Sequence, residues 1–119
     1  MVVTGSYHGA VFALSQGIQA IAIAGSGYYR AKFQGLAQQF PGGVEIVDVA
    51  ESGWEGRLEM LIARAWQSAE NVRRGLLGAA VQQIDLSRRA YRTVAQLAEA
   101  RQTMHAAETR ATLGRAAQT

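Results

Sequence analysis

The sequence contains no cysteine and a single proline, and no apolar run reaches the roughly 18 residues that a bilayer-spanning helix needs. Without cysteine the chain forms neither disulfides nor thiolate metal sites, and it has no cysteine nucleophile. The opening Met-Val-Val lacks the basic start and the small-residue cleavage site of a signal peptide. We therefore expect a cytoplasmic protein without a transmembrane segment.

Acidic residues are scarce in the second part of the chain. Residues 1–70 carry four basic and six acidic side chains, whereas residues 71–119 carry eight arginines and three acids. A basic segment can bind nucleic acid or an anionic membrane surface, or it can be the solvated face of a helix. These arginines follow a helical pattern, and Tyr91 is the one aromatic residue among them, so they lack the regular aromatic interleaving that stacks on bases and we expect no nucleic-acid partner.

Short apolar segments alternate with helical patterns. Val2-Val3 ends a strand, residues 18–24 are typical of a strand buried on both faces, and residues 44–49 form a third strand. A helical pattern follows each strand, and such alternation with short connections requires a parallel sheet with right-handed crossovers. The predicted fold class is α/β: a partial Rossmann-like three-layer domain with a short parallel sheet of about three strands and a long C-terminal helix.

The helical stripe continues without proline from about residue 69 onward. We expect residues 1–68 to form a Rossmann-like half-domain and residues 69–119 a long, partly exposed helical extension. Trp54 and Trp66 fall on the apolar face of the third helical pattern and are predicted to lie in the core. Three strands, the first of barely two residues, make an incomplete sheet. We therefore expect either the carboxyl-terminal piece of a larger protein or self-association through the C-terminal helix.

Candidate chemistry begins where the first strand ends. Ser6 or Tyr7 can cap the following helix, whose free N–H groups attract anions. His8 stands at the edge where open α/β sheets bind ligands. It is either an anion contact or acid, or an ordinary capping or core histidine. The residues alone leave both interpretations open.

The second strand-to-helix junction is Gly25-Ser26-Gly27, followed by Tyr28. The two glycines allow a ligand to approach the backbone, and Tyr28, Arg30 and Lys32 can contact a nucleotide or a sugar. Arginine at position 30 excludes the dinucleotide pattern GxGxxG, which needs a glycine there. An ordinary turn between a strand and a helix has the same composition, so this interpretation also stays open.

Asp48 and Glu51 flank the end of the third strand. Two close carboxylates can bind a sugar hydroxyl or act as acid and base, but a strand-end acid more often caps the next helix. His105 has no second histidine or cysteine at metal-ligand spacing and is expected to be exposed. No metal site is predicted.

One family resemblance covers about residues 3–66. The carboxyl-terminal domain of polysaccharide pyruvyl transferase family proteins is similar to TGSYHGAVFALSQGI at residues 4–18: a strand ends in a short polar motif closed by histidine, and a small apolar helix, Gly-Ile and a buried strand follow. The continuation AIAGSGYY at residues 22–29, with Lys32-Phe33 and Gly35-Leu36, looks like one branch of that family.

The resemblance implies a GT-B-like architecture, in which the active site lies between two Rossmann-like domains. Members transfer a pyruvyl group from phosphoenolpyruvate to a sugar hydroxyl in cell-surface polysaccharides. The implied partners are thus a small-molecule donor and a glycan acceptor, with no further cofactor. His8 occupies the position of the motif histidine, a general acid or anion contact. The donor-binding residues that follow from the resemblance are Gly5, Ser6, Tyr7, Gly25, Ser26 and Tyr28.

Two positions depart from the family pattern. Ser6 stands where many members carry arginine, and Gln19 stands where proline is common. The serine leaves a second interpretation open, a GT-B glycosyltransferase that uses a nucleotide sugar. A third interpretation is a non-catalytic α/β module that assembles through its basic helix.

Overall fold

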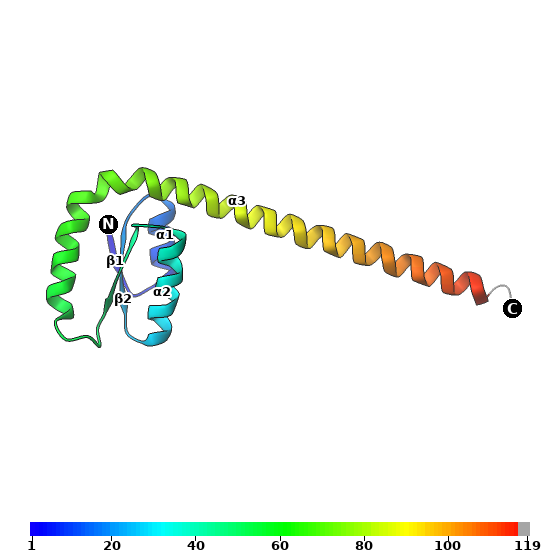
Figure 1. Ribbon diagram of the computed structural model, residues 1–119, viewed down its shortest axis with the longest axis horizontal. Helices are drawn as coiled ribbons and strands as arrows, with labels where there is room; N and C mark the ends of the chain where they lie inside the picture. Colours follow the sequence, from blue (N-terminus) through cyan, green and yellow to red (C-terminus); the bar gives the residue numbers. More distant parts are fainter. Residues whose placement is uncertain (117–119) are drawn as a thin grey trace. The chain divides into compact units, whose positions relative to one another are not determined.

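The computed structural model describes residues 1–116, and Figure 1 shows the path of the chain. Its elements are β1 (Val2–Thr4), α1 (Tyr7–Ser15), β2 (Ala20–Ala24), α2 (Gly27–Gln39), β3 (Val44–Asp48) and α3 (Trp54–Ala116). The strands form one parallel sheet in the order β1-β2-β3, with Val3 opposite Ile21 and Ala22 opposite Ile46. The predicted α/β class, with a short parallel sheet and a long C-terminal helix, is confirmed.

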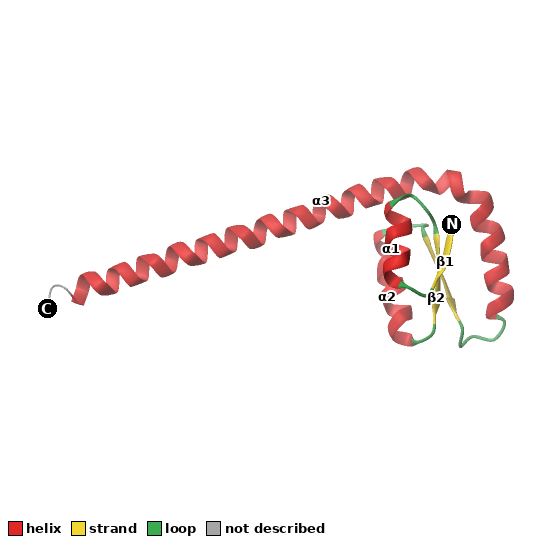
Figure 2. Cartoon of the chain, turned by 180° about the vertical axis from the view of Figure 1, so that it is seen from behind, coloured by secondary structure: helices red, strands yellow, loops and turns green. Residues whose placement is uncertain are grey.

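The chain divides into two compact units, Met1–Gln83 and the segment from Ile84 onward. In the first unit, α1 and α2 cover one face of the sheet, where Leu14 and Phe33 are fully buried. The first turns of α3 cover the opposite face, where Leu61 packs with Ile21. Figures 1 and 2 show these three layers, with the sheet between helices.

Helix α3 contributes to both cores of the first unit. Leu61 and Ala65 belong to the cluster on one face of the sheet, whereas Leu76 and Ala80 belong to the cluster formed with α1 and α2. A Cβ atom on Gly43 would lie 2.4 Å from Leu76 Cδ2, so this stretch of α3 passes against the backbone that leads into β3. A single helix therefore encloses the sheet from two sides.

The turn after α1 depends on a glycine. Gly17 has φ of 77°, a left-handed conformation that side chains with a Cβ rarely adopt. A Cβ at this position would also lie 3.0 Å from Arg73 Cγ and from Leu77 Cγ. Gly17 thus serves both the end of α1 and the close passage of α3.

The burial of β2 agrees with its sequence, and the burial of one tryptophan does not. In β2 the side chains of Ala20, Ile21, Ala22 and Ala24 are buried, as expected for a strand covered on both faces. Trp54 is half-buried against the second cluster. The prediction that Trp66 lies in the core is wrong, because it is 77% exposed. Ala65 faces the sheet, and the next residue of an α-helix points about 100° away.

In the second unit, α3 continues as a helix whose side chains at residues 84–113 are exposed. Helix α3 is assigned as one helix from Trp54 to Ala116, although Figure 1 shows it bending sharply within the first unit, and that unit extends to Gln83. Within residues 1–116, no helix combines the length and the apolar character that crossing a bilayer requires.

Candidate functional site

The candidate site lies at the carboxyl edge of the sheet. Because the three strands are parallel, the connections to α1, α2 and α3 all leave from this edge, and Ala24 pairs with Asp48 there. Open parallel sheets bind ligands at this edge, where the helices that follow also present their N-termini. The three connections therefore decide what the site can bind.

The first connection, Gly5-Ser6, is a tight turn held by hydroxyl groups. The Ser6 N–H donates to Thr4 Oγ1 at 3.0 Å, and Ser6 Oγ accepts from the Gly9 N–H at 3.2 Å. Ser6 is the N-cap of α1, as the sequence predicted for Ser6 or Tyr7. The other N–H groups of the first turn have no partner within the helix and stay available to an anion.

His8 lies on the first turn of α1 with its side chain exposed. Its ring stands edge-on to the Tyr7 ring at a centroid distance of 5.9 Å, and Tyr7 in turn contacts the buried Phe33 at 6.2 Å. The interpretation of His8 as an ordinary capping or core histidine is wrong, because Ser6 is the cap and His8 is exposed.

The second connection is open around its glycines. Ser26 is the N-cap of α2, and its Oγ accepts from the Tyr29 N–H at 3.5 Å. A Cβ on Gly25 or on Gly27 would meet no atom within 4 Å. The packing of the fold therefore does not require small residues at these two positions. The open space beside the backbone leaves room for a ligand. Tyr28 is 64% exposed next to them.

Lys32 of α2 contacts the first residues of both α1 and α2. Its Nζ lies 4.9 Å from the centre of the Tyr7 ring and 5.3 Å from the centre of the Tyr28 ring, so two aromatic faces hold the ammonium group. Among residues 1–116, no carboxylate forms an ion pair with Lys32. We call Tyr7, His8, Tyr28 and Lys32, with the two helix N-termini, the α1–α2 edge. Its net charge is positive.

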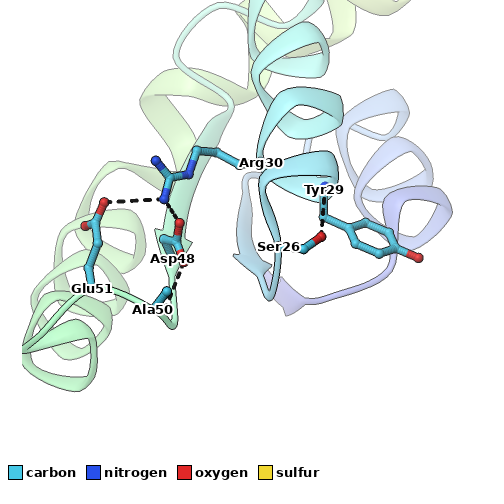
Figure 3. Close-up of polar contacts among 6 residues, drawn as sticks. All are labelled: Ser26, Tyr29, Arg30, Asp48, Ala50 and Glu51. Carbon is cyan, nitrogen blue, oxygen red and sulfur yellow. Dashed lines mark hydrogen bonds and ion pairs between the residues drawn. The ribbon is translucent and has the colours of Figure 1, made fainter.

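The third connection is held by an ion pair. Figure 3 shows Arg30 reaching from α2 to the end of β3, where its guanidinium pairs with Asp48 and lies 3.9 Å from Glu51. Asp48 is 6% exposed, and its second oxygen accepts from the Ala50 N–H at 2.9 Å. The expectation that Asp48 caps the next helix is wrong, since the carboxylate anchors the loop to Arg30 instead.

A small cavity of about 200 Å³ adjoins this ion pair. Its lining residues are Arg30, Gln34, Ile46, Asp48, Glu51 and Arg57. Two guanidinium groups balance two carboxylates there, so this part of the site carries no excess charge. The attraction for an anion lies at the α1–α2 edge instead.

Replacing Asp48 with alanine is expected to lower the free energy of unfolding by roughly 1–3 kcal/mol, because it removes a charged hydrogen bond and an ion pair. Solvent screening of Arg30, which is 43% exposed, keeps the loss below that of a fully buried pair. Urea denaturation measures the change. Glu51→Gln is the matched control, and we expect less than about 0.5 kcal/mol because that carboxylate is exposed. Equal losses for both variants would contradict this account.

His105 lies on the exposed part of α3, in the second unit, as predicted. In the part of the chain that the structure describes, no three His, Asp or Glu side chains lie close enough to hold a metal ion. Comparisons of the chain with protein-family models, with curated proteins and with solved structures gave no significant match. The function is therefore argued from the residues and their geometry.

Proposed function

We propose that this chain is the carboxyl-terminal part of a polysaccharide pyruvyl transferase-like enzyme, and that its α1–α2 edge binds phosphoenolpyruvate. One observation carries the proposal: at the carboxyl edge of a parallel sheet the Tyr7 ring lies beside both His8 and Lys32, and no carboxylate pairs with Lys32 among residues 1–116. A small, strongly anionic donor matches this arrangement of charge.

The donor carries a phosphate and a carboxylate, and both need positive surroundings. Helix N-termini present free N–H groups and a positive dipole end to such groups. Lys32 adds a full charge that the Tyr7 and Tyr28 rings hold between the two helices. Together they orient the donor without a metal ligand set.

The chemistry requires an acid near the donor. In the transfer, a proton adds to the methylene carbon, two sugar oxygens bond to the central carbon, and the carbon–oxygen bond to phosphate breaks. Of the two hydroxyl protons, one balances the new methyl group and the other leaves with phosphate. We assign His8 as the general acid or as the contact that stabilises the departing phosphate. Its exposed place on α1 leaves the ring free to meet a ligand.

The departure at Ser6 is consistent with this assignment. Ser6 supplies a cap and no charge, whereas many members of the family carry arginine at this position. Lys32 stands on the neighbouring helix and places its charge against Tyr7, the residue that follows Ser6. We propose that this lysine replaces the missing arginine. The glycan acceptor would then bind on the second Rossmann-like domain that a GT-B-like enzyme requires, in the cytoplasm.

The testing experiment is thermal unfolding of the chain with added ligands. Phosphoenolpyruvate is expected to stabilise it by about 2.7 kcal/mol at a hundredfold excess over its Kd. Lys32→Gln should remove most of the stabilisation by phosphoenolpyruvate. Arg88→Gln, in the second unit, is the matched control and should leave that stabilisation unchanged. Protection by uridine nucleotides and not by phosphoenolpyruvate would contradict the proposal in favour of a nucleotide-sugar glycosyltransferase. No response to either ligand class would favour a non-catalytic module.

A further inference from the structure

A seam of small and apolar residues runs along the second unit. Eight positions alternate in steps of four and three residues, the spacing that keeps one face of a helix toward a partner helix. They are Leu86, Ala90, Thr93, Leu97, Ala100, Met104, Ala107 and Ala111. All eight side chains are exposed, with Leu97 and Met104 each 65% exposed. An uncovered seam of this length indicates an interaction surface.

We propose that this seam pairs with the same seam of a second copy of the chain, and that the two helices run antiparallel. In the register that we infer, Met104 lies opposite Ala107 of the second copy, and Ala100 lies opposite Ala111 of the second copy. Each large side chain then faces a small one. Alanines along the seam allow the two backbones to approach closely.

The charges beside the seam select this register. Arg101 and Glu108 lie on one flank of the seam, each directly after one of its residues. The antiparallel register brings Arg101 beside Glu108 of the second copy. The two-fold symmetry repeats each contact. Glu108 of each copy therefore gains an arginine of the other copy.

Arg101 and Glu108 form no ion pair with each other within one chain. Among residues 1–116, the ion pairs involve only Arg30, Asp48, Glu51, Glu45 and Arg64. Arg101 and Glu108 are about 10 Å apart along the helix axis, which is too far for a direct contact. Their complementarity is thus available to a second copy.

A parallel, in-register pair fits the charges less well. Flanking positions of parallel helices meet five residues apart, which would set Arg110 beside Arg115 of the second copy and would offer no pair of opposite charges. Like charges across a helix interface disfavour that arrangement. The charge pattern therefore favours the antiparallel pair.

The paired segment within the described residues, 95–116, is about 33 Å long and presents a strip roughly 10 Å wide. Two such strips bury less than the roughly 1,200–2,000 Å² of a standard stable interface. We therefore expect a reversible dimer whose Kd lies in the micromolar range. Because its ion pairs are exposed at the edge of the strip, salt should weaken it.

Sedimentation equilibrium of the full chain over a range of concentrations tests the dimer. Glu108→Arg and Arg101→Glu should each raise the Kd of the dimer at least tenfold, and the double variant should restore it to within about threefold. Asp85→Arg lies outside the paired segment and is the matched control. Circular dichroism confirms that each variant remains helical. A double variant whose dimer has a Kd as high as those of the single variants would overturn the proposed register.

Cysteine cross-linking tests the orientation, since the natural chain has no cysteine that would interfere. A mixture of Met104→Cys and Ala107→Cys chains should form mainly the mixed disulfide, and each variant alone should cross-link poorly. Efficient cross-linking of Met104→Cys with itself would indicate parallel helices and overturn the proposal. A chain that stays monomeric at every concentration, or that binds phosphatidylglycerol vesicles as a monomer, would overturn it too. Neither test uses phosphoenolpyruvate, so the dimer and the proposed function fail independently.

Discussion

Under the proposed function, replacing His8 with alanine is expected to lower the kcat of pyruvyl transfer by about 10²- to 10⁴-fold, the usual contribution of a positioned general acid. The melting temperature should stay within a degree or two of the wild-type value, because the side chain is exposed and Ser6 supplies the helix cap. Steady-state kinetics of the chain together with the second domain that the proposed function requires, with phosphoenolpyruvate as the varied substrate, measures the effect.

The two roles assigned to His8 leave different kinetic signatures. Loss of an acid lowers kcat, whereas loss of an anion contact that acts equally on ground state and transition state raises KM for phosphoenolpyruvate. His105→Ala is the matched control, because it removes the other histidine of the chain, on the exposed part of α3. A His8→Ala protein that fails to fold would show instead that this histidine is structural. A folded variant with full activity would contradict its place in the site.

Replacing Leu76 with alanine is expected to lower the free energy of unfolding by about 2–5 kcal/mol, the range measured for buried leucines. Leu76 is 1% exposed and belongs to the same buried cluster as Leu14 and Phe33. Removing its branched end leaves a cavity at the point where α3 passes Gly43. Urea denaturation of the full chain, followed by circular dichroism, reports the change in midpoint.

The adjacent leucine provides the control for that experiment. Leu77 is 40% exposed, so Leu77→Ala removes the same atoms at a site that buries much less of them. We expect Leu77→Ala to lower the free energy of unfolding by less than half as much as Leu76→Ala does. Equal losses of unfolding free energy for the two variants would contradict the assignment of Leu76, and not Leu77, to the buried side of α3. No loss at Leu76 would mean that this stretch of α3 is not packed on the first unit in solution.

The strands and caps of the first unit could be predicted from short stretches of sequence, because each has a local cause. The apolar run at residues 18–24 indicated a doubly covered strand, and β2 forms within it at Ala20–Ala24. A serine before the first helical pattern indicated a cap, which Ser6 provides. In both cases the signal and the structure lie within a few residues of each other.

The contacts that shape the site could not be predicted in this way, because they join residues from different elements. Arg30 pairs with Asp48 only because α2 and β3 become neighbours in the fold. Lys32 meets Tyr7 through the packing of α2 beside α1. Each of these residues was noted in the sequence, but the distances between the partners depend on the tertiary structure. The exposure of Trp66 has the same origin, since helical periodicity alone does not say which edge of a broad apolar stripe touches the sheet.

The path of α3 across both cores has a consequence for synthesis on the ribosome. A chain that has emerged only as far as Ala65 contains all three strands and can cover one face of the sheet, but the other face still lacks Leu76. The nascent chain must therefore keep Leu14 and Phe33 incompletely covered until a further stretch of α3 leaves the exit tunnel. Completion of the first unit thus waits for Leu76 and Ala80 to leave the tunnel, and the apolar surface exposed before then makes this interval the one most open to chaperone binding.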